Sequence, residues 1–332
     1  MLPPGFADAG CLTPETLFDL NALPQHLVII GAGPVGVEMA QAFRRLGAAV
    51  TLIGKAERLL PNADDQASAF LRGVFEREEI TVRLKVTAES AVRRDGMTTV
   101  TLSDGTTVTG AAVLVAVGKR PNIGSLRLEA AGVEARDGRL TLDDRLRTTQ
   151  RHIWAAGDVT GGAQHTHYAG WQAFQAVRNA LFPLTSVGVR AQVPSATFTD
   201  PEIAQAGLTE RDARAQYGGA VQVTQLPFSR ADRAMTEGRP DGFMKLIHHP
   251  NGRLIGAHIV GHQAGEMIND WIAVLEKNGR VWDAAFAMRV YPTLGTANVI
   301  LATEQVKKQL RTGGLGRVIR GVSRLARRGE PS

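Results

Sequence analysis

The hydrophobic and polar positions of the chain are most regular near its start. Residues 27–30 (LVII) form a continuous apolar run, an amphipathic segment follows up to Gly47, and a second apolar run occupies residues 49–53. A continuous apolar run is typical of a strand buried on both faces, whereas apolar residues spaced by three and four indicate a helix. The segment therefore predicts a strand–helix–strand unit, and with it a Rossmann-like α/β domain.

Three glycines lie between the first apolar run and the helix. Gly31 permits a tight turn, Gly33 lets a pyrophosphate approach the backbone, and Gly36 lets the helix close on the strand. Pro34 and Val35 complete the loop, and the helix N-terminus then faces the anion. The loop predicts a dinucleotide-binding site, with a glycine-rich turn that binds no ligand as the less favoured interpretation.

The end of the second apolar run bears on the choice of nucleotide. Gly54 stands where an acidic residue would bind the ribose of NAD, and Lys55 and Arg58 follow it. Cations without an acid favour the 2′-phosphate of NADP. NAD stays the alternative, with Glu57 as a ribose ligand and with the two cations merely exposed.

Further along, the pattern alternates between strands, turns and helices. Residues 99–110 (TVTLSDGTTVTG) predict a hairpin that turns at Asp104 and Gly105, and the apolar residues 112–117 predict a buried strand that leads into a loop. Residues from about 190 to 308 alternate apolar runs with amphipathic segments such as AGEMINDWIAVLEKNG. This alternation predicts a second domain built from strands and helices.

Composition and charge narrow the function classes. The 332 residues, 44% of them hydrophobic and 21% charged, are typical of a globular protein with two domains or more. The net charge of +6 is concentrated after residue 310, where six arginines and one glutamate carry +5. Their spacing predicts a basic amphipathic helix. This helix could rest on an anionic membrane surface, but a solvated terminal helix is favoured, and its lack of aromatic residues argues against nucleic acid.

Cys11 is the only cysteine, which excludes an internal disulfide and a zinc site of the cysteine type. The adjacent His248 and His249 point apart on a strand, so no metal site is expected. The chain has neither a run of about 20 apolar residues nor the layout of a secretory signal, and a cytoplasmic location is expected. Any redox chemistry then has to come from a bound cofactor.

Five motifs follow one another along the chain: the glycine-rich unit, VAVGKRPN, IWAAGDV, VPSATFTDPEIAQAGLTE and GFMKLIHHPNGRLIGAHIVGHQAGEMI. In this order they resemble the pyridine nucleotide–disulfide oxidoreductase family, close to its mercuric-reductase-like and dihydrolipoamide-dehydrogenase-like members. The resemblance covers about residues 3–305. It implies an FAD-dependent NAD(P)H oxidoreductase in which a hydride passes from the nicotinamide to the flavin.

The resemblance also implies a division into domains and a homodimer. The expected parts are a linker remnant at 1–22, an NAD(P)-binding domain at 23–145, the C-terminal part of a split FAD domain at 146–188, an α+β dimerisation domain at 189–308 and a basic tail at 309–332. In the family the dimerisation domain brings the partner subunit to each active site.

Carried onto this sequence, the family motifs assign further cofactor contacts. Glu38 would face the nicotinamide side of the flavin, or would simply be an acid in the first turn of the helix, where the helix dipole favours it. Gly118 and Lys119 would lie in a loop that approaches both cofactors, although the family more often has arginine at the position of Lys119.

The IWAAGDV segment and the helix after it would hold part of the FAD. The motif contains Gly157 and Asp158, and Asp158 would accept a hydrogen bond from the ribityl chain. Thr166, His167 and Ala169 would lie under the isoalloxazine ring, where backbone amides can stabilise negative charge on the reduced flavin. The histidine side chain could equally be a polar residue at a helix start.

Near the C-terminus the chain departs from the disulfide reductases of the family. These enzymes place a His-Pro-Thr segment followed by Glu as an acid–base pair, whereas YPTLGT puts Tyr291 and Thr296 at those positions. Tyrosine is a poor proton carrier near neutral pH. An interface packing role for Tyr291 is therefore favoured over a catalytic one.

The resemblance further implies an N-terminal FAD half with its own glycine-rich loop and a Cys-x4-Cys pair, and neither occurs in these 332 residues. The chain is thus expected to be incomplete, as a truncation, as one product of a split gene or through a late start. A separately encoded FAD half is an expected partner. The alternative function is a non-catalytic protein that binds a dinucleotide and forms dimers.

Overall fold

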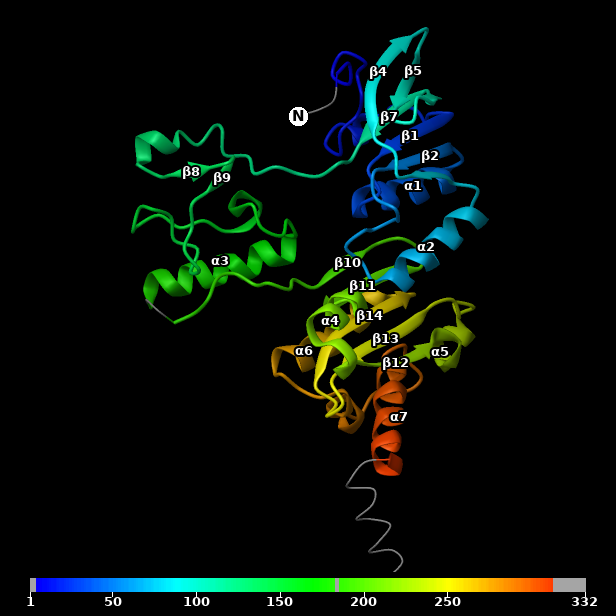
Figure 1. Cartoon of the computed structure of the whole chain (residues 1–332), viewed down its shortest axis with the longest axis vertical. Coiled ribbons are helices and arrows are strands. Elements are labelled where there is room, and N and C mark those ends of the chain that lie inside the picture. The colour runs from blue at the N-terminus through cyan, green and yellow to red at the C-terminus, as the bar shows by residue number, and fades with distance from the viewer. Residues whose placement is uncertain (1–3, 183–184, 313–332) are drawn as a thin grey trace, which may run out of the picture. The chain divides into compact units, whose positions relative to one another are not determined.

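The computed structural model describes residues 4–182 and 185–312 and falls into two compact units (Figure 1). Of the described residues, 4–116 and 196–312 form the first unit, and 117–182 and 185–195 form the second. The expected domain boundary at 145/146 lies inside the second unit. Residues 117–145 fold with the segment that follows them, because Pro121 and Arg139 pack around Gly161. The basic tail after residue 312 lies outside the described residues.

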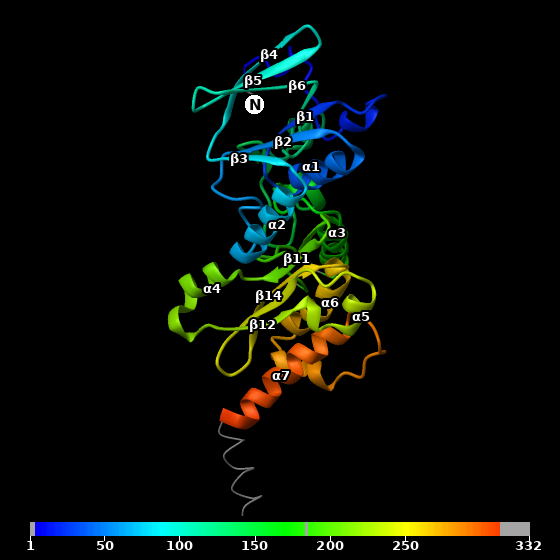
Figure 2. The ribbon, with the colours of Figure 1, turned by 90° about the vertical axis from the view of Figure 1, so that its right-hand side faces the viewer.

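The first unit begins with a parallel sheet of order β3-β2-β1-β7, seen with its helices in Figure 2. Its elements are β1 (His26–Ile30), α1 (Pro34–Leu46), β2 (Ala49–Gly54), α2 (Asp65–Arg77), β3 (Thr81–Leu84) and β7 (Ala112–Val115). β1 pairs with β2 and β7 in parallel, so the carboxyl ends of these strands share one edge of the sheet. The predicted strand–helix–strand unit is therefore confirmed.

Burial explains why this segment folds as it does. Residues Leu27 to Ile30 are buried, as a central strand covered on both faces requires. Pro34 is the first residue of α1, where its fixed φ suits a helix start, and Gly47 ends the helix with a φ of 110°.

An antiparallel sheet of three strands carries the predicted hairpin. Its strands are β4 (Ala88–Arg94), β5 (Met97–Leu102) and β6 (Thr107–Gly110). Gly105 has a φ of 78°, and the Asp104 carboxylate accepts hydrogen bonds from the backbone and side chain of Thr106. These contacts close the turn at the two residues that the sequence indicated.

A five-stranded antiparallel sheet follows, of order β10-β11-β14-β13-β12. Its strands are β10 (Ser195–Thr197), β11 (Glu202–Gly207), β12 (Gln222–Pro227), β13 (Phe243–His248) and β14 (Leu254–Gly261). Its helices are α4 (Glu210–Tyr217), α5 (Asp232–Thr236), α6 (Ala264–Glu276) and α7 (Thr296–Thr312). The predicted α+β domain is confirmed, and α7 continues past the expected end at 308. Trp271 is buried beneath α7 and donates its indole hydrogen bond to Asn298 over 2.9 Å.

The second unit contains β8 (Ala135–Arg136), β9 (Arg139–Leu140) and α3 (Thr166–Leu181). One side of α3 is apolar and exposed, with Phe174, Val177 and Leu181 between 59% and 67% accessible. Short 3-10 turns complete the two units: η1 (Leu17–Asp19), η2 (Leu128–Ala131), η3 (Gly157–Thr160), η4 (Gly218–Ala220), η5 (Phe228–Arg230) and η6 (Val281–Phe286). Among the helices of the described residues, none is both long and apolar enough to cross a membrane.

Candidate functional site

The glycine-rich loop connects the carboxyl end of β1 to the start of α1. Gly31 has a φ of 121° and donates its N–H to Ile53 O at 2.8 Å, which fixes the loop against β2. Gly33 caps α1 without a side-chain hydrogen bond. The first N–H groups of a helix have no partner within the helix, so those of α1 are available to an anion.

The glycines at 33 and 36 have opposite surroundings. A Cβ at Gly36 would lie 1.8 Å from Gly31 O, so close packing of helix on strand requires glycine there. A Cβ at Gly33 would meet no atom of residues 4–182 and 185–312 within 4 Å, so the space beside this residue is open in the described part of the chain. This pair of observations fits the predicted roles, with Gly36 closing the turn and Gly33 leaving room for a pyrophosphate.

The carboxyl end of β2 is crowded at the backbone and open at Lys55. A Cβ at Gly54 would lie 2.7 Å from the Ala32 Cβ and 3.1 Å from Leu84 Cδ2. An acidic side chain at position 54 would therefore displace the loop or β3. Lys55 and Glu57 are exposed, so both alternatives from the sequence remain accessible to a ribose or its phosphate.

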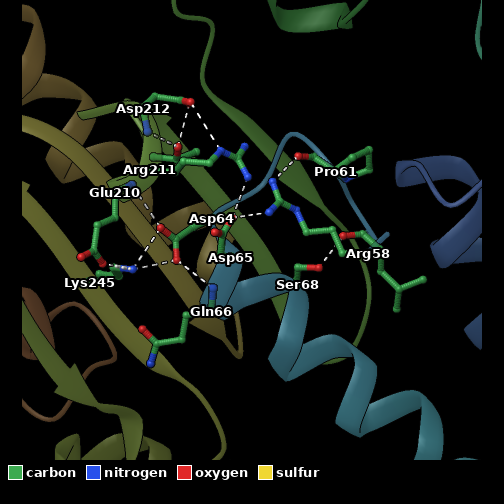
Figure 3. A network of polar contacts seen from close by, with 12 residues as sticks. Arg58, Pro61, Asp64, Asp65, Gln66, Ser68, Glu210, Arg211, Asp212 and Lys245 are labelled. Atoms are coloured by element: carbon green, nitrogen blue, oxygen red, sulfur yellow. Dashed lines mark hydrogen bonds and ion pairs between the residues drawn. The ribbon is translucent and has the colours of Figure 1, made fainter. Parts of the chain in front are cut away.

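Arg58 is already bound by the protein (Figure 3). Its Nη1 lies 2.5 Å from Asp65 Oδ1, its Nη2 donates to Pro61 O at 2.7 Å, and its side chain is only 20% exposed. The predicted pairing of Arg58 with a 2′-phosphate has no support in this conformation, because both terminal nitrogens have partners. Lys55 is the cation that stays accessible at this position.

Glu38 lies half-buried in the second turn of α1. The alternative that it is a first-turn acid is wrong, since the first turn of α1 contains none. Its Oε1 accepts a hydrogen bond from the Phe198 backbone N–H at 2.8 Å. Burial raises the pKa of Glu38 above its ordinary value, and this hydrogen bond opposes the shift. The carboxyl group is thus held in one place by a segment distant in sequence.

The same face of α1 makes further contacts that the sequence did not reveal. Gln41 accepts from Asp200 N at 2.7 Å and donates to Asp200 O at 2.8 Å. Arg45 donates to the Asp200 carboxylate at 2.7 Å. Glu38, Gln41 and Arg45 are spaced by three and four residues, so one side of α1 is fastened to residues 198–200.

In the second unit, the predicted FAD contacts share one small region. Gly118 has a φ of 126°, and the Lys119 ammonium lies 3.9 Å from the Asp158 carboxylate. Gly157 has a φ of 80° and donates its N–H to Gln172 Oε1 at 2.9 Å. A Cβ at Gly157 would lie 2.9 Å from the Ala169 Cβ, so glycine lets the motif approach α3.

The start of α3 is open at its first turn. The helix begins at Thr166, as predicted, and has no side-chain cap. The rings of His165 and His167 are stacked with centroids 5.2 Å apart, and His167 Nε2 donates to Pro194 O at 2.8 Å. Burial, and then the charge of His167, lower the pKa of His165. The N–H groups of this turn have no side-chain cap and are available to an electron-rich group, and the contact with the flavin ring stays a prediction.

Tyr291 is 68% exposed, and its hydroxyl donates to Asp232 Oδ2 at 2.9 Å. This hydrogen bond and the negative charge of Asp232 raise the pKa of Tyr291, so the phenol loses its proton even less readily than usual. Within residues 4–182 and 185–312, no cluster of three His, Cys, Asp or Glu side chains could hold a metal ion.

Comparison with known families accounts for this arrangement. Residues 6–173 match the pyridine nucleotide-disulphide oxidoreductase family, and residues 193–300 match the dimerisation domain of the same family. The chain belongs to the pyridine nucleotide-disulphide oxidoreductase family. The resemblance drawn from five sequence motifs is therefore confirmed.

Relatives of this chain are named as dehydrogenases and reductases. Dihydrolipoyl dehydrogenase 3 of Haloarcula marismortui is 32% identical over 303 residues, which cover 88% of this chain and 63% of that protein. A mercuric reductase of Bacillus cereus is 34% identical over 297 residues, covering 88% of this chain and 47% of the relative. The chain thus spans between about half and two thirds of these pyridine nucleotide-disulphide oxidoreductases.

Solved structures of the family agree with the fold. LpdA from Mycobacterium tuberculosis superposes with a TM-score of 0.83 at 32% identity, over 89% of this chain and 64% of the other. The HOCl-induced flavoprotein disulfide reductase RclA from Escherichia coli, as its Cu(II) complex, gives a TM-score of 0.84 at 29% identity, over 91% and 69%. The mixed α/β fold with a Rossmann-like sheet and a dimerisation domain is that of flavoprotein disulfide reductases.

Proposed function

We propose that this chain supplies the nicotinamide-binding and dimerising parts of an FAD-dependent NAD(P)H oxidoreductase. The observation that carries the proposal is the loop at Gly31 to Gly36, which is closed at Gly36 and open at Gly33 in a member of this family. Bound FAD would accept a hydride from NAD(P)H and pass electrons to a further acceptor.

The residues of the chain would bind and orient the two cofactors. The N-terminus of α1 would hold the nucleotide pyrophosphate, and Glu38, fixed by Phe198, would face the nicotinamide. In the second unit, Asp158 would bind the ribityl chain, and the uncapped first turn of α3 would lie beneath the flavin ring. Gly118 and Lys119 would contact both cofactors.

The residues at hand do not provide dithiol chemistry. Cys11 is the only cysteine in the sequence, and its pKa is raised by burial, which disfavours the reactive thiolate. Tyr291 replaces the histidine of the disulfide reductases, and its raised pKa makes it a poor proton carrier. We infer that a thiol pair, if the reaction uses one, comes from outside these 332 residues.

Two partners follow from the proposal. One is a second copy of this chain, joined through the dimerisation domain at 193–300, where Phe286, Met288 and Val290 are between 79% and 99% exposed. The other is a segment that brings the phosphate loop for the FAD pyrophosphate, on a longer product or on a separate chain. The exposed apolar side of α3 offers that segment a surface.

The first test concerns the nucleotide. We expect NADPH to bind about tenfold more tightly than NADH, because Lys55 is exposed beside a strand end that has no acid at Gly54. The variant Lys55→Ala should bring the two dissociation constants together, as measured by fluorescence titration. Lys277→Ala, at the end of α6, is the control for loss of an exposed lysine and should leave the ratio unchanged. Equal affinities in the unsubstituted chain would contradict the NADP preference.

The second test concerns the flavin. We expect the 332-residue chain to retain little FAD. Asp158 and the start of α3 would contact only the ribityl and ring portions of FAD, and the FAD pyrophosphate would have no glycine-rich loop and helix N-terminus of its own. Losing several charge-assisted hydrogen bonds of about 1.5 to 3 kcal/mol each would weaken a nanomolar site beyond micromolar. Flavin absorbance after gel filtration, with light scattering for the mass of the dimer, is the measurement.

Co-expression with an N-terminal FAD half of the family is the matching experiment. It should yield a flavin-bound species that oxidises NADPH. Stoichiometric FAD on the chain by itself would contradict the predicted weak retention. Nucleotide binding without any flavin uptake in the co-expressed pair would instead support the alternative function, a non-catalytic dinucleotide-binding dimer.

A further inference from the structure

We propose that Asp65 sets the nucleotide specificity of this chain by holding Arg58 away from the 2′-phosphate of NADP. Asp65 would touch neither cofactor and would act only through Arg58, as a positioning residue. The inference rests on the proposed function, because it concerns the nucleotide that the glycine-rich loop binds.

The contacts of Arg58 leave its guanidinium no free terminal nitrogen. Asp65 Oδ1 lies 2.5 Å from Nη1, and Pro61 O accepts from Nη2 at 2.7 Å. The third nitrogen, Nε, is buried and has no hydrogen-bond partner among the residues that the structure describes. To bind a phosphate, Arg58 would first have to leave Asp65, and an ion pair with a carboxylate is a strong competitor for a guanidinium.

Arg58 is nevertheless close to where a ribose phosphate would bind. A cavity of about 160 Å³ is lined by Arg58, Asp65 and Leu84, among others. Leu84 Cδ2 also lies 3.1 Å from the place of a Cβ at Gly54, at the carboxyl end of β2. In Rossmann domains the adenosine ribose is recognised at the end of this strand. A released Arg58 would therefore share this region with Lys55.

Asp65 cannot follow Arg58 towards the nucleotide, because its own position is fixed from the other side (Figure 3). Arg211 of α4 donates to the same Asp65 Oδ1 at 2.9 Å. The preceding residue, Asp64, accepts two hydrogen bonds from the buried Lys245 ammonium, at 2.9 and 3.0 Å. The start of α2 is thus anchored to the antiparallel sheet, and Asp65 with it.

The test is a double-variant cycle on the full chain, read as the ratio of NADH to NADPH dissociation constants. Asp65→Asn should raise this ratio about tenfold, because Arg58 then becomes available to the 2′-phosphate. Arg58→Gln alone should leave the ratio within about twofold of the unsubstituted chain. Arg58→Gln added to Asp65→Asn should remove the gain. A loss of packing alone would not produce this pattern.

Controls separate the charge of Asp65 from its contact with Arg58. Asp212→Asn removes the same charge beside Arg211, 3.7 Å from its Nε, and should leave the ratio unchanged. Asp65→Glu keeps a carboxylate and should keep the original ratio. Asp65→Ser, a favourable residue at a helix start, repeats the test if Asp65→Asn folds poorly by circular dichroism.

Adenosine 2′,5′-bisphosphate and AMP replace the dinucleotides as minimal probes, and their affinity ratio should follow the same pattern. An unchanged ratio in both Asp65→Asn and Asp65→Ser, with nucleotide binding intact, would overturn the inference and leave the proposed function standing. So would a gain that persists after Arg58 is replaced. If the unsubstituted chain binds no nucleotide at all, the proposed function fails and the inference fails with it.

Discussion

A Lys245→Met variant is expected to lose about 3–5 kcal/mol of unfolding free energy, because it leaves a buried carboxylate without its cation. Lys245 lies on β13 with its side chain 5% exposed, and the Asp64 side chain is 1% exposed. The ammonium also lies 2.7 Å from Glu210 Oε2, so one cation serves two acids. Methionine fills a similar volume but neutralises neither of them.

The pH dependence of this loss has a definite sign. Burial tends to raise the pKa of Asp64, but hydrogen bonds from Lys245 and the charge of His258 lower it on balance. A folded pKa below the unfolded value of about 3.9 stabilises the fold above that value, and the stabilisation disappears as the pH falls through the folded pKa. In Lys245→Met the ammonium no longer opposes burial, and only the charge of His258 and the backbone hydrogen bond from Glu210 still lower the pKa of Asp64. We expect the pKa of Asp64 to rise in the variant, so that protonation on acidification relieves the penalty.

Urea unfolding of the unsubstituted chain and of Lys245→Met at pH 7 and pH 5 measures both effects. The difference in unfolding free energy should be larger at pH 7 than at pH 5. Asp64→Asn combined with Lys245→Met should recover part of the loss, since asparagine can still accept from Gln66 N at the start of α2. The control variant Lys277→Met removes an exposed lysine and should change the unfolding free energy little. A loss below about 1 kcal/mol in Lys245→Met would show that water or rearrangement compensates the buried charge.

Local patterns in the sequence were sufficient to predict the elements around the glycine-rich loop. A continuous apolar run, three glycines and a helical period predicted β1, α1 and β2, and the structure has them at His26–Ile30, Pro34–Leu46 and Ala49–Gly54. The hairpin at Asp104 and Gly105 could also be predicted, because the local backbone preferences of these residues favour a turn. Each of these elements depends on contacts within a few residues or between neighbouring strands.

Which charged residues form ion pairs with one another could not be predicted from local patterns in the sequence. From the sequence, Arg58 was expected to be an exposed cation, but it pairs with Asp65 at the start of the next helix. Arg211, which pairs with the same Asp65 carboxylate, is 146 residues away from Asp65. Lys245 and Asp64 are 181 residues apart, and Glu38 and Phe198 are 160 apart. Pairings at such separations depend on how the parallel sheet packs against the antiparallel one.

The domain boundary predicted at 145/146 also differs from the structure, in which the second unit begins at residue 117. The apolar strand before Gly118 ends the parallel sheet, and residues 117–195 then form their own unit. Arg147 and Trp154 both follow the expected boundary, and they form an antiparallel β-bridge with each other within this unit. Residues 117–145 contain little regular structure beyond β8 and β9, so hydrophobic periodicity carried no signal for their placement.

Gly36→Ala is expected to weaken nucleotide binding strongly and also to destabilise the fold. The added Cβ would lie 1.8 Å from Gly31 O and 2.9 Å from Gly31 C, a backbone contact that no rotamer can relieve. The loop must shift, and a loop displaced by about 1 Å no longer presents its N–H groups to the pyrophosphate. We expect a loss of about 100-fold or more in NADPH affinity, and about 1–3 kcal/mol of unfolding free energy from the overpacking.

Two further glycines separate these effects. Gly33→Ala should weaken NADPH binding to a similar extent but leave stability nearly unchanged, because its Cβ enters open space that the pyrophosphate would occupy. Gly73→Ala, within α2 and with only the Arg77 guanidinium near its Cβ, should keep binding intact and raise stability by about 0.5–1 kcal/mol. Isothermal titration and urea unfolding of the three variants give the comparison. Normal NADPH affinity in Gly33→Ala would mean that the nucleotide does not approach the backbone there, and the site at the start of α1 would have to be abandoned.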